Sequence, residues 1–274
     1  MYAIYYSYMK KNRFFGRYYK FISLDGYSFA FIKSVANEGD MLQLITKEKA
    51  FFIYDLSSIE IKDDVITFNI NQDGLSFVGS ITLGELHPLS KKVMGPFTNL
   101  PLECYHFIDS MYHSINGSIK VNGKDISFDG GRGYIEGDKG TNFPKKYIWY
   151  NSVLPDATIT LAIASIPLFK IINFTGILCF IKTKDKEYYL STYNFTKAKT
   201  ISEELIVLKK GQYQLSLYLN SKDGHKLKAP IKGNMVRYIK ENICIPTSYS
   251  FSYKGKAILD NKDDLSSLEY MWEI

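Results

Sequence analysis

The chain has 274 residues, of which 46% are hydrophobic and 15% aromatic, and it carries a formal charge of +6 at pH 7. A sequence this rich in apolar and aromatic side chains can bury a large core, which argues against a disordered chain and fits one large domain or two closely packed halves. Its lysines and arginines are scattered and form no basic stripe, so we expect no nucleic-acid partner.

Short runs with partial two-residue alternation fill the first half of the chain and predict strands. Turn residues separate them, as in Asn37–Asp40 and Val121–Lys124, where Asn, Asp and Gly accept the positive φ of tight hairpins. Neighbouring runs should therefore pair antiparallel. The predicted strands of this half are Ser28–Val35, Met41–Thr46, Ala50–Tyr54, Val65–Ile70, Leu75–Leu83 and Gly117–Val121.

Two histidines, His106 and His113, stand seven residues apart and would lie on opposite faces of an uninterrupted strand. This spacing does not support a metal site shared by the pair. One interpretation is a buried, hydrogen-bonded histidine and a second one that faces a cavity or water. The alternative is a neutral histidine in a substrate pocket.

The segment Phe128–Trp149 concentrates the functional signal of the sequence. If residues 132–138 are extended, one face collects the polar side chains, which are Arg132, Tyr134, Glu136 and Asp138. The Cα atoms of Glu136 and Asp138 would then lie about 6.5–7 Å apart. In a dry site, repulsion between two such carboxylates raises one pKa and makes that group a proton donor near neutral pH.

A second interpretation of the same residues stays open. Residues 136–140 can form an exposed turn in which glycine supplies positive φ and the carboxylates pair with Lys139 or Arg132 in solvent. The sequence contains no nucleotide-binding loop, nucleophile elbow or zinc-protease motif, and the glycines at 130–133 do not match a dinucleotide fingerprint. We therefore expect no cofactor and no metal.

The second half of the chain continues with strand-like runs at Thr158–Ser165, Phe174–Lys182, Glu187–Tyr193 and Gln212–Leu219. Ile159–Ile181 is long and apolar enough for a membrane span, but a lysine near the centre of a span costs about 2.5–3.5 kcal/mol. Because Pro167 and Lys170 interrupt it, two paired strands are favoured. Only Thr200–Lys209 suggests a helical period. We predict an all-β protein of antiparallel strands.

Three cysteines, Cys104, Cys179 and Cys244, are odd in number and far apart, so they predict neither a disulfide framework nor a zinc site. The N-terminus lacks the basic and apolar segments of a signal peptide. We therefore expect a cytoplasmic protein. Attachment to the periphery of an anionic membrane through basic strand ends stays open, and the sequence carries no signal for oligomeric state.

The run FDGGRGYIEGDKG at Phe128–Gly140, followed by Phe143-Pro144 and Tyr147–Trp149, resembles the central signature of the tocopherol cyclase-like family. Arg13–Lys20 is similar to the aromatic opening of that family. Further segments that look like the family's approach to the signature are Gly95–Phe97, Leu102–His106, Met111–His113 and Gly117–Ile119. The resemblance covers most of residues 12–200 and is strongest in the central signature.

This resemblance implies two lipocalin-like antiparallel β-barrel or half-barrel units, akin to those of carotenoid hydratases. We place them at residues 1–145 and 146–274, with the seam near Thr141–Pro155. It further implies a hydrophobic small-molecule partner, a prenylated phenol or polyene, held in an apolar pocket. In the family, an acid protonates a double bond of the prenyl chain and the phenol oxygen captures the cation. No metal or redox cofactor takes part.

The resemblance implies a role for each polar residue of the segment. Asp138 or Glu136 would be the acid, while Tyr134 and Arg132 would orient the phenol or stabilise the ionised partner. The other residues expected to contact substrate are Tyr18, Tyr19, His106, His113 and Trp149. The chain would then be a cofactor-independent isomerase of the tocopherol cyclase-like kind.

Two departures from the family pattern weaken the expectation of the same substrate. Lys139 and Tyr18 stand where members commonly have tryptophan. The alternative is therefore a lipocalin-like carrier that holds a lipid, quinone or pigment and performs no chemistry.

Overall fold

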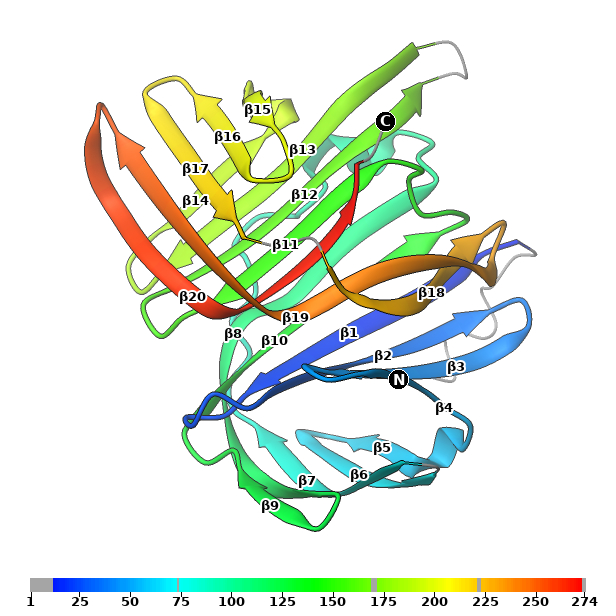
Figure 1. The fold of residues 1–274 in the computed structure, drawn as a ribbon. Helices are drawn as coiled ribbons and strands as arrows, with labels where there is room; N and C mark the ends of the chain where they lie inside the picture. The colour runs from blue at the N-terminus through cyan, green and yellow to red at the C-terminus, as the bar shows by residue number, and fades with distance from the viewer. Residues whose placement is uncertain (1–11, 73, 169–171, 221–222, 273–274) are drawn as a thin grey trace.

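Two ten-stranded antiparallel sheets make up the computed structural model, which describes residues 12–72, 74–168, 172–220 and 223–272 (Figure 1). The first sheet contains β1 (Phe14–Ile22), β2 (Ser28–Ala36), β3 (Gly39–Thr46), β4 (Ala50–Ile53), β5 (Ile59–Lys62), β6 (Val65–Gln72), β7 (Leu75–Leu83), β8 (Cys104–Val121), β9 (Lys124–Ser127) and β10 (Gly131–Gly140). The second contains β11 (Tyr147–Val153), β12 (Ala157–Leu168), β13 (Ile172–Thr183), β14 (Glu187–Ser191), β15 (Lys197–Ile201), β16 (Leu205–Lys210), β17 (Tyr213–Leu219), β18 (His225–Ile231), β19 (Asn234–Tyr253) and β20 (Lys256–Met271). Short 3₁₀ turns lie at Leu56–Ser58, Gly95–Asn99 and Thr192–Asn194.

Both sheets are built to the same plan. The strand order of the first is β4-β3-β2-β1-β10-β8-β7-β6-β5, with β9 paired to β8. The order of the second is β14-β13-β12-β11-β20-β19-β17-β16-β15, with β18 paired to β19. The strand pairs β1–β10 and β11–β20 therefore hold equivalent central places, and each has a long strand beside it, β8 or β19. The predicted all-β fold of two packed lipocalin-like units is confirmed.

Aromatic contacts show that each sheet curls on itself. Phe29 of β2 and Phe68 of β6 lie far apart in the strand order, yet their ring centroids are 5.6 Å apart. In the second sheet, Tyr188 of β14 lies 4.9 Å from Phe251 of β19. Each half is thus a half-barrel, and the curl of both sheets is visible in Figure 1. The inner face of each half-barrel holds an aromatic and aliphatic core.

Burial along the strands explains why the sequence showed only partial alternation. In β6, Ile66, Phe68 and Ile70 are buried while Thr67 and Asn69 are exposed, as expected for a strand with one wet face. All seven residues of β11 are buried. One face of β11 packs inside the second half-barrel and the other faces the first sheet, so its sequence does not alternate.

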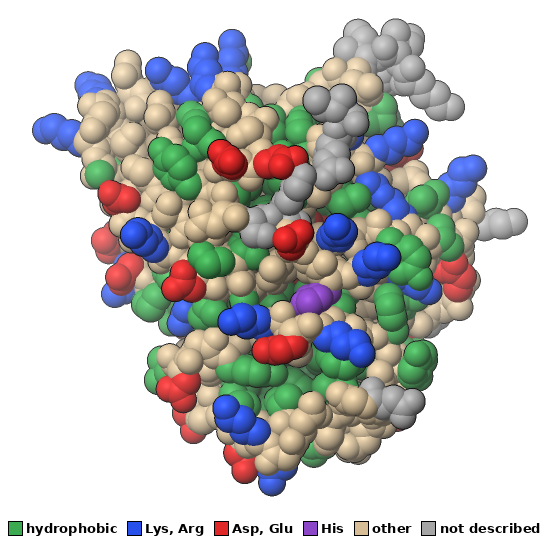
Figure 2. All heavy atoms as spheres, viewed as in Figure 1, with side chains coloured by type: hydrophobic (Ala, Val, Ile, Leu, Met, Phe, Trp, Pro, Cys, Tyr) green, Lys and Arg blue, Asp and Glu red, His purple; other side chains and the backbone are tan. Residues whose placement is uncertain are grey.

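The central strands of the two sheets pack against each other and are joined by polar contacts. The ammonium group of Lys20 in β1 donates to the carbonyl oxygen of Leu265 in β20 at 2.6 Å. The Arg132 Nε–H of β10 donates to the carbonyl oxygen of Val153 in β11 at 2.5 Å. These contacts fix the two half-barrels face to face. On the face shown in Figure 2, acidic and basic side chains are interspersed over both halves.

Most predicted strands match the observed ones, and Leu75–Leu83 matches at both ends. The helix suggested at Thr200–Lys209 is wrong. Ile206 and Leu208 are buried while Lys209 is exposed, so the segment follows the two-residue period of β16. The pair of strands predicted within Ile159–Ile181 is confirmed as β12 and β13, which pair antiparallel.

Three other predictions concern the ends and the seam of the chain. Lys170 and the first eleven residues, where no signal peptide is predicted, lie outside the described residues. Among the helices of the described ranges, none is both long and apolar enough to cross a membrane. The boundary at 145/146 falls between β10 and β11; whether each half is an independent domain stays a prediction.

Candidate functional site

A cavity with a volume of about 150 Å³ lies between the central strands of the two sheets. A space of this size holds a group as large as a benzene ring. Most of its wall is apolar or aromatic, and both sheets contribute. The apolar lining includes Phe14, Tyr18, Ile32, Phe143, Tyr147, Trp149, Ile163 and Leu178, and the polar lining includes Cys104, His106, Glu136, Asp138 and Glu269.

On the first-sheet side of the cavity, His106 bridges two carboxylates. His106 of β8 and Asp138 of β10 are opposite each other in the antiparallel pair. The His106 Nδ1 lies 3.1 Å from the Asp138 Oδ1, and the His106 Nε2 lies 3.3 Å from the Glu136 Oε2. Alternation along β10 places both carboxylates on the same face, as predicted, and the histidine joins them.

The electrostatics of this bridge favour an imidazolium. Burial lowers the pKa of His106, but the neighbouring charges of Glu136 and Asp138 outweigh burial and raise it well above its usual value. Tyr134 completes the group because its hydroxyl donates to the Glu136 Oε2 and accepts a hydrogen bond of 2.7 Å from Thr160 of the second sheet. The cation and its two carboxylates therefore form one connected network.

On the second-sheet side, Glu269 of β20 lines the cavity and is only 8% exposed. The hydroxyl of Tyr147 donates a hydrogen bond to its Oε2. Burial, followed by the charge of Glu241, raises the pKa of Glu269 well above its usual value, although the Tyr147 hydrogen bond acts in the opposite direction. Among the described residues Glu269 forms no ion pair. Its surroundings therefore favour the protonated carboxylic acid over the carboxylate.

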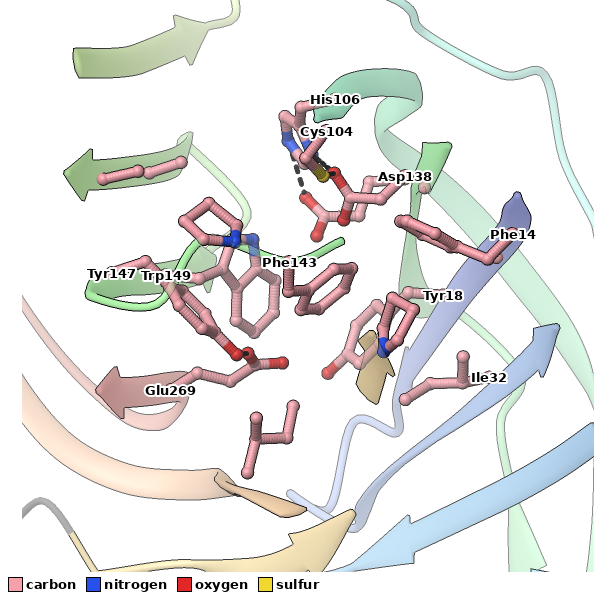
Figure 3. A pocket seen from close by; sticks show the side chains of 18 of the residues that line it. Phe14, Tyr18, Ile32, Cys104, His106, Asp138, Phe143, Tyr147, Trp149 and Glu269 are labelled. Atoms are coloured by element: carbon pink, nitrogen blue, oxygen red, sulfur yellow. Dashed lines mark hydrogen bonds and ion pairs between the residues drawn. The ribbon is translucent and has the colours of Figure 1, made fainter. Parts of the chain in front are cut away.

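Figure 3 shows the two polar groups separated by aromatic rings: Asp138 and His106 on one side of the pocket, Glu269 and Tyr147 on another. The Tyr18 ring meets the Trp149 ring edge to face with centroids 5.2 Å apart. The buried Trp149 Nε1–H has no hydrogen-bond partner among the described residues. The walls therefore offer ring faces that stabilise positive charge and one free donor for a ligand oxygen.

The structure brings five of the predicted site residues to the cavity wall: Tyr18, His106, Glu136, Asp138 and Trp149. Tyr134 stands behind Glu136. The predicted alternative of an exposed turn at residues 136–140 is wrong, since Glu136 lies within β10 and is 4% exposed.

Three predicted contact residues do not reach the cavity wall. Arg132 binds the Val153 carbonyl, and Tyr19 stacks on Phe31 with ring centroids 4.6 Å apart. His113 is fully buried on the other face of β8, where its Nδ1 lies 3.1 Å from the Ser110 hydroxyl. Burial, with the charge of His87, lowers the pKa of His113 to about 4. His113 is therefore the buried, neutral member of the histidine pair.

The two residues that depart from the family pattern, Lys139 and Tyr18, lie in different places relative to the cavity. Lys139 is exposed and is not part of the cavity wall, so the side chain at this position does not shape the pocket. Tyr18 forms part of the wall. Only the departure at position 18 thus bears on the ligand.

Sequence reasoning missed Glu269. It lies in β20 between Leu268 and Tyr270, which are 3% and 8% exposed. The one signal in the sequence is a single charged residue within an apolar run. Charged residues are common within strands because alternate positions of a strand often face solvent, so this signal does not point to a site. Among the residues that the structure describes, no group of three or more His, Cys, Asp or Glu side chains is arranged to hold a metal ion.

Comparisons with known proteins bear on the fold. No family model and no curated protein matches the sequence. Among solved structures, the chain is similar to kievitone hydratase from Nectria haematococca, at 13% identity, with a TM-score of 0.54 over 96% of this chain and 90% of the other. It is also similar to CghA, at 7% identity, with a TM-score of 0.59 over 96% and 89% of the two chains. CghA with Sch210972 gives a TM-score of 0.60 at the same identity and coverage. The chain shares the lipocalin-like fold of these proteins, and its relationship to tocopherol cyclases stays a prediction.

Proposed function

We propose that the protein is an enzyme that protonates a carbon–carbon double bond of a small hydrophobic substrate and allows an oxygen nucleophile to capture the cation. One observation carries the proposal: a buried carboxyl group without an ion-pair partner among the described residues, Glu269, and an ion-paired histidine–carboxylate group face the same small aromatic cavity. Two titratable groups whose surroundings drive them to opposite protonation states are the usual sign of an acid and a base.

In this reaction the Glu269 hydroxyl donates its proton to one alkene carbon, and positive charge develops on the other. The rings of Trp149 and Tyr18 stabilise that charge and exclude stray water. The oxygen of a phenol in the same substrate attacks in a ring closure, or a water attacks in a hydration. Its proton passes to Asp138, which the His106 imidazolium holds in place. Glu269 gives one proton to the substrate, and Asp138 accepts one proton from it.

This assignment changes the roles that the sequence suggested. Asp138 and Glu136 were expected to supply the acid, but both contact an imidazolium and are placed to accept a proton. Glu269 takes the donor role because a buried carboxyl group without a cation favours its protonated form.

The size of the cavity restricts the substrate. A volume of about 150 Å³ admits a single ring or a short branched chain. A phenol or quinol with one short prenyl group fits this space better than one with a long tail, whose remainder would lie outside the cavity. The names of the structural neighbours agree with small-molecule chemistry, since one is a hydratase and another holds Sch210972.

The test uses dimethylallyl-hydroquinone and the purified protein in deuterated water. Ring closure gives an isomer that carries one deuterium on carbon, and hydration gives a product heavier by one water. We expect Glu269→Gln to slow either reaction by about 10²–10⁴-fold, the usual contribution of a general acid. Glu60→Gln removes an exposed carboxylate of β5 and serves as the matched control. Unchanged turnover in Glu269→Gln would contradict the assignment of the acid.

The second candidate is a carrier of a lipid, quinone or pigment. Two features favour a carrier. Tyr18 stands in the wall where the cyclase-like family commonly has tryptophan, and the Trp149 Nε1–H has no hydrogen-bond partner among the described residues. Native mass spectrometry of protein purified from its own source distinguishes the two. A bound amphiphile that is never converted on incubation supports carriage, whereas its conversion supports the enzyme.

A further inference from the structure

Glu241 occupies a position that the proposed reaction does not yet use. It lies on β19 directly opposite Glu269 of β20 in the antiparallel pair. Side chains in such pairs share a face, with Cβ atoms about 4.5–5.5 Å apart. Glu269 reaches the cavity wall and Glu241 does not. The two side chains therefore lie side by side on one face of the sheet, with Glu269 at the cavity wall and Glu241 outside it.

The burial of Glu241 is complete and its oxygens are poorly satisfied. The residue is 0% exposed, and neither carboxyl oxygen has a partner in full hydrogen-bond geometry among the described residues, although the Tyr18 hydroxyl lies close enough to lower the pKa of this carboxyl group. A buried carboxylate with so little compensation is costly, whereas the protonated acid carries no charge to desolvate. The surroundings thus favour a Glu241 that holds a proton.

Charged and titratable groups from several strands face this carboxyl group. Burial raises its pKa to about 8, and Glu136 adds to this, while Tyr18 and Lys20 act in the opposite direction. Lys20 is itself fully buried. His225 of β18 is the register partner of Glu241 on the other side, and its Nε2 lies 2.9 Å from the Lys47 carbonyl oxygen. The ammonium of Lys20 is well placed to stabilise Glu241 while it is briefly ionised.

We infer that Glu241 is the proton reservoir of the site, which returns a proton to Glu269 after each transfer to substrate. The inference rests on the proposed function. Glu269 gives its proton to the alkene carbon and becomes a carboxylate. The Glu241 hydroxyl then protonates that carboxylate, and Glu241 is left ionised beside Lys20 and Tyr18. After product leaves, one proton from solvent restores Glu241, which balances the proton that the substrate oxygen releases toward Asp138.

A reservoir is useful here because Glu269 is only 8% exposed and lines the cavity that the proposed substrate occupies. The carboxyl group on the adjacent strand holds a second proton within the fold and supplies it while the cavity is still occupied. Glu241 does not touch substrate, so its role is to reset the acid.

The experiment compares single and multiple turnovers of dimethylallyl-hydroquinone by the full-length protein and by Glu241→Gln. With protein in excess, the first turnover of the variant should match the wild-type rate, because Glu269 is intact. With substrate in excess, steady-state turnover should fall about 100-fold. The wild-type rate should also fall as pH rises through about 8, where Glu241 loses its proton. The rate of the variant should not show this decrease.

Infrared spectroscopy provides a readout that does not depend on activity. The absorption of a protonated carboxyl group at neutral pH should weaken in Glu241→Gln and in Glu241→Met, a second variant that removes the unpartnered polar atoms altogether. An unchanged band, or a normal steady-state rate in both variants, contradicts the reservoir. Absence of turnover in the wild type contradicts the proposed function instead, so the two failures are distinct. Glu60→Gln is again the matched control.

Discussion

The two half-barrels place a glutamate at the same point of one scaffold and give it opposite surroundings. Glu136 lies on β10 opposite Tyr18 of β1, and Glu269 lies on the equivalent strand β20 opposite Trp149 of β11. Both glutamates face the cavity between the sheets. The backbone plan therefore does not distinguish them.

The neighbouring long strand makes the difference. In the first half β8 contributes His106, which pairs with both carboxylates of β10. In the second half β19 contributes Glu241 at the register position of Glu269. One cation or one further acid on the adjacent strand thus decides whether a central glutamate joins an ion-paired network or keeps its proton. The repeated fold acquires two chemical sides in this way.

Removal of the cation should have the largest effect on the difference between the two halves. We expect His106→Leu to lower the free energy of unfolding at pH 7 by about 3–5 kcal/mol, because two buried or half-buried carboxylates lose their partner. Urea denaturation measures the change. Adding Glu136→Gln and Asp138→Asn to His106→Leu should recover much of it. A loss below about 1 kcal/mol in the single variant would mean that the bridge contributes no more than an exposed ion pair.

The two halves should also differ in how their stability depends on pH. The folded-state pKa of His106 is raised, so its stabilisation is complete below the unfolded value near 6.5 and is lost as pH rises through the folded value. Glu241 and Glu269 also keep protons in the folded state that the unfolded chain releases near pH 4.3. All three groups make the free energy of unfolding fall as pH rises.

The pH range over which the free energy of unfolding falls differs between the two halves. Glu241→Gln should flatten the profile between about pH 4.5 and 8, where each such proton contributes a slope of about 1.4 kcal/mol per pH unit. His106→Leu should flatten it only above about pH 6.5. Urea denaturation at half-unit steps of pH resolves the two windows. A wild-type profile that is level from pH 5 to 8 would contradict both assignments.

Much of the fold could be predicted from local patterns. Alternation and turn residues located most strands, because strands with one wet face show a period of two, as β6 does. The same rule failed for β11, whose faces are both buried. Within one strand, alternation also placed Glu136 and Asp138 together correctly, since that question depends on neighbours along the chain only.

The rest of the site depends on contacts across the chain. Nothing local links Glu269 to Tyr147, which is 122 positions away, or Lys20 to Leu265, which is 245 positions away. Which acid keeps its proton is decided by the residues that β8 and β19 set beside the central strands. Those pairings depend on register, which short-range patterns do not determine. The sequence therefore indicated one polar wall and placed the acid there, whereas the reaction that we propose takes its proton from the other side of the cavity.

The smallest expected effect concerns the two departures from the cyclase-like pattern. Lys139→Trp restores the family's aromatic residue at an exposed position, so we expect a stability change within about 0.5 kcal/mol and unchanged turnover of dimethylallyl-hydroquinone. Tyr18→Trp restores the aromatic residue in the cavity wall and should cost about 1–3 kcal/mol through overpacking, besides removing the hydroxyl that lies 3.2 Å from Ser267. Urea denaturation and steady-state kinetics measure both variants. A change of substrate preference in Lys139→Trp would contradict the placement of that side chain outside the pocket, whereas a change confined to Tyr18→Trp would make position 18 the point where this chain and the cyclase-like family differ in what they accept.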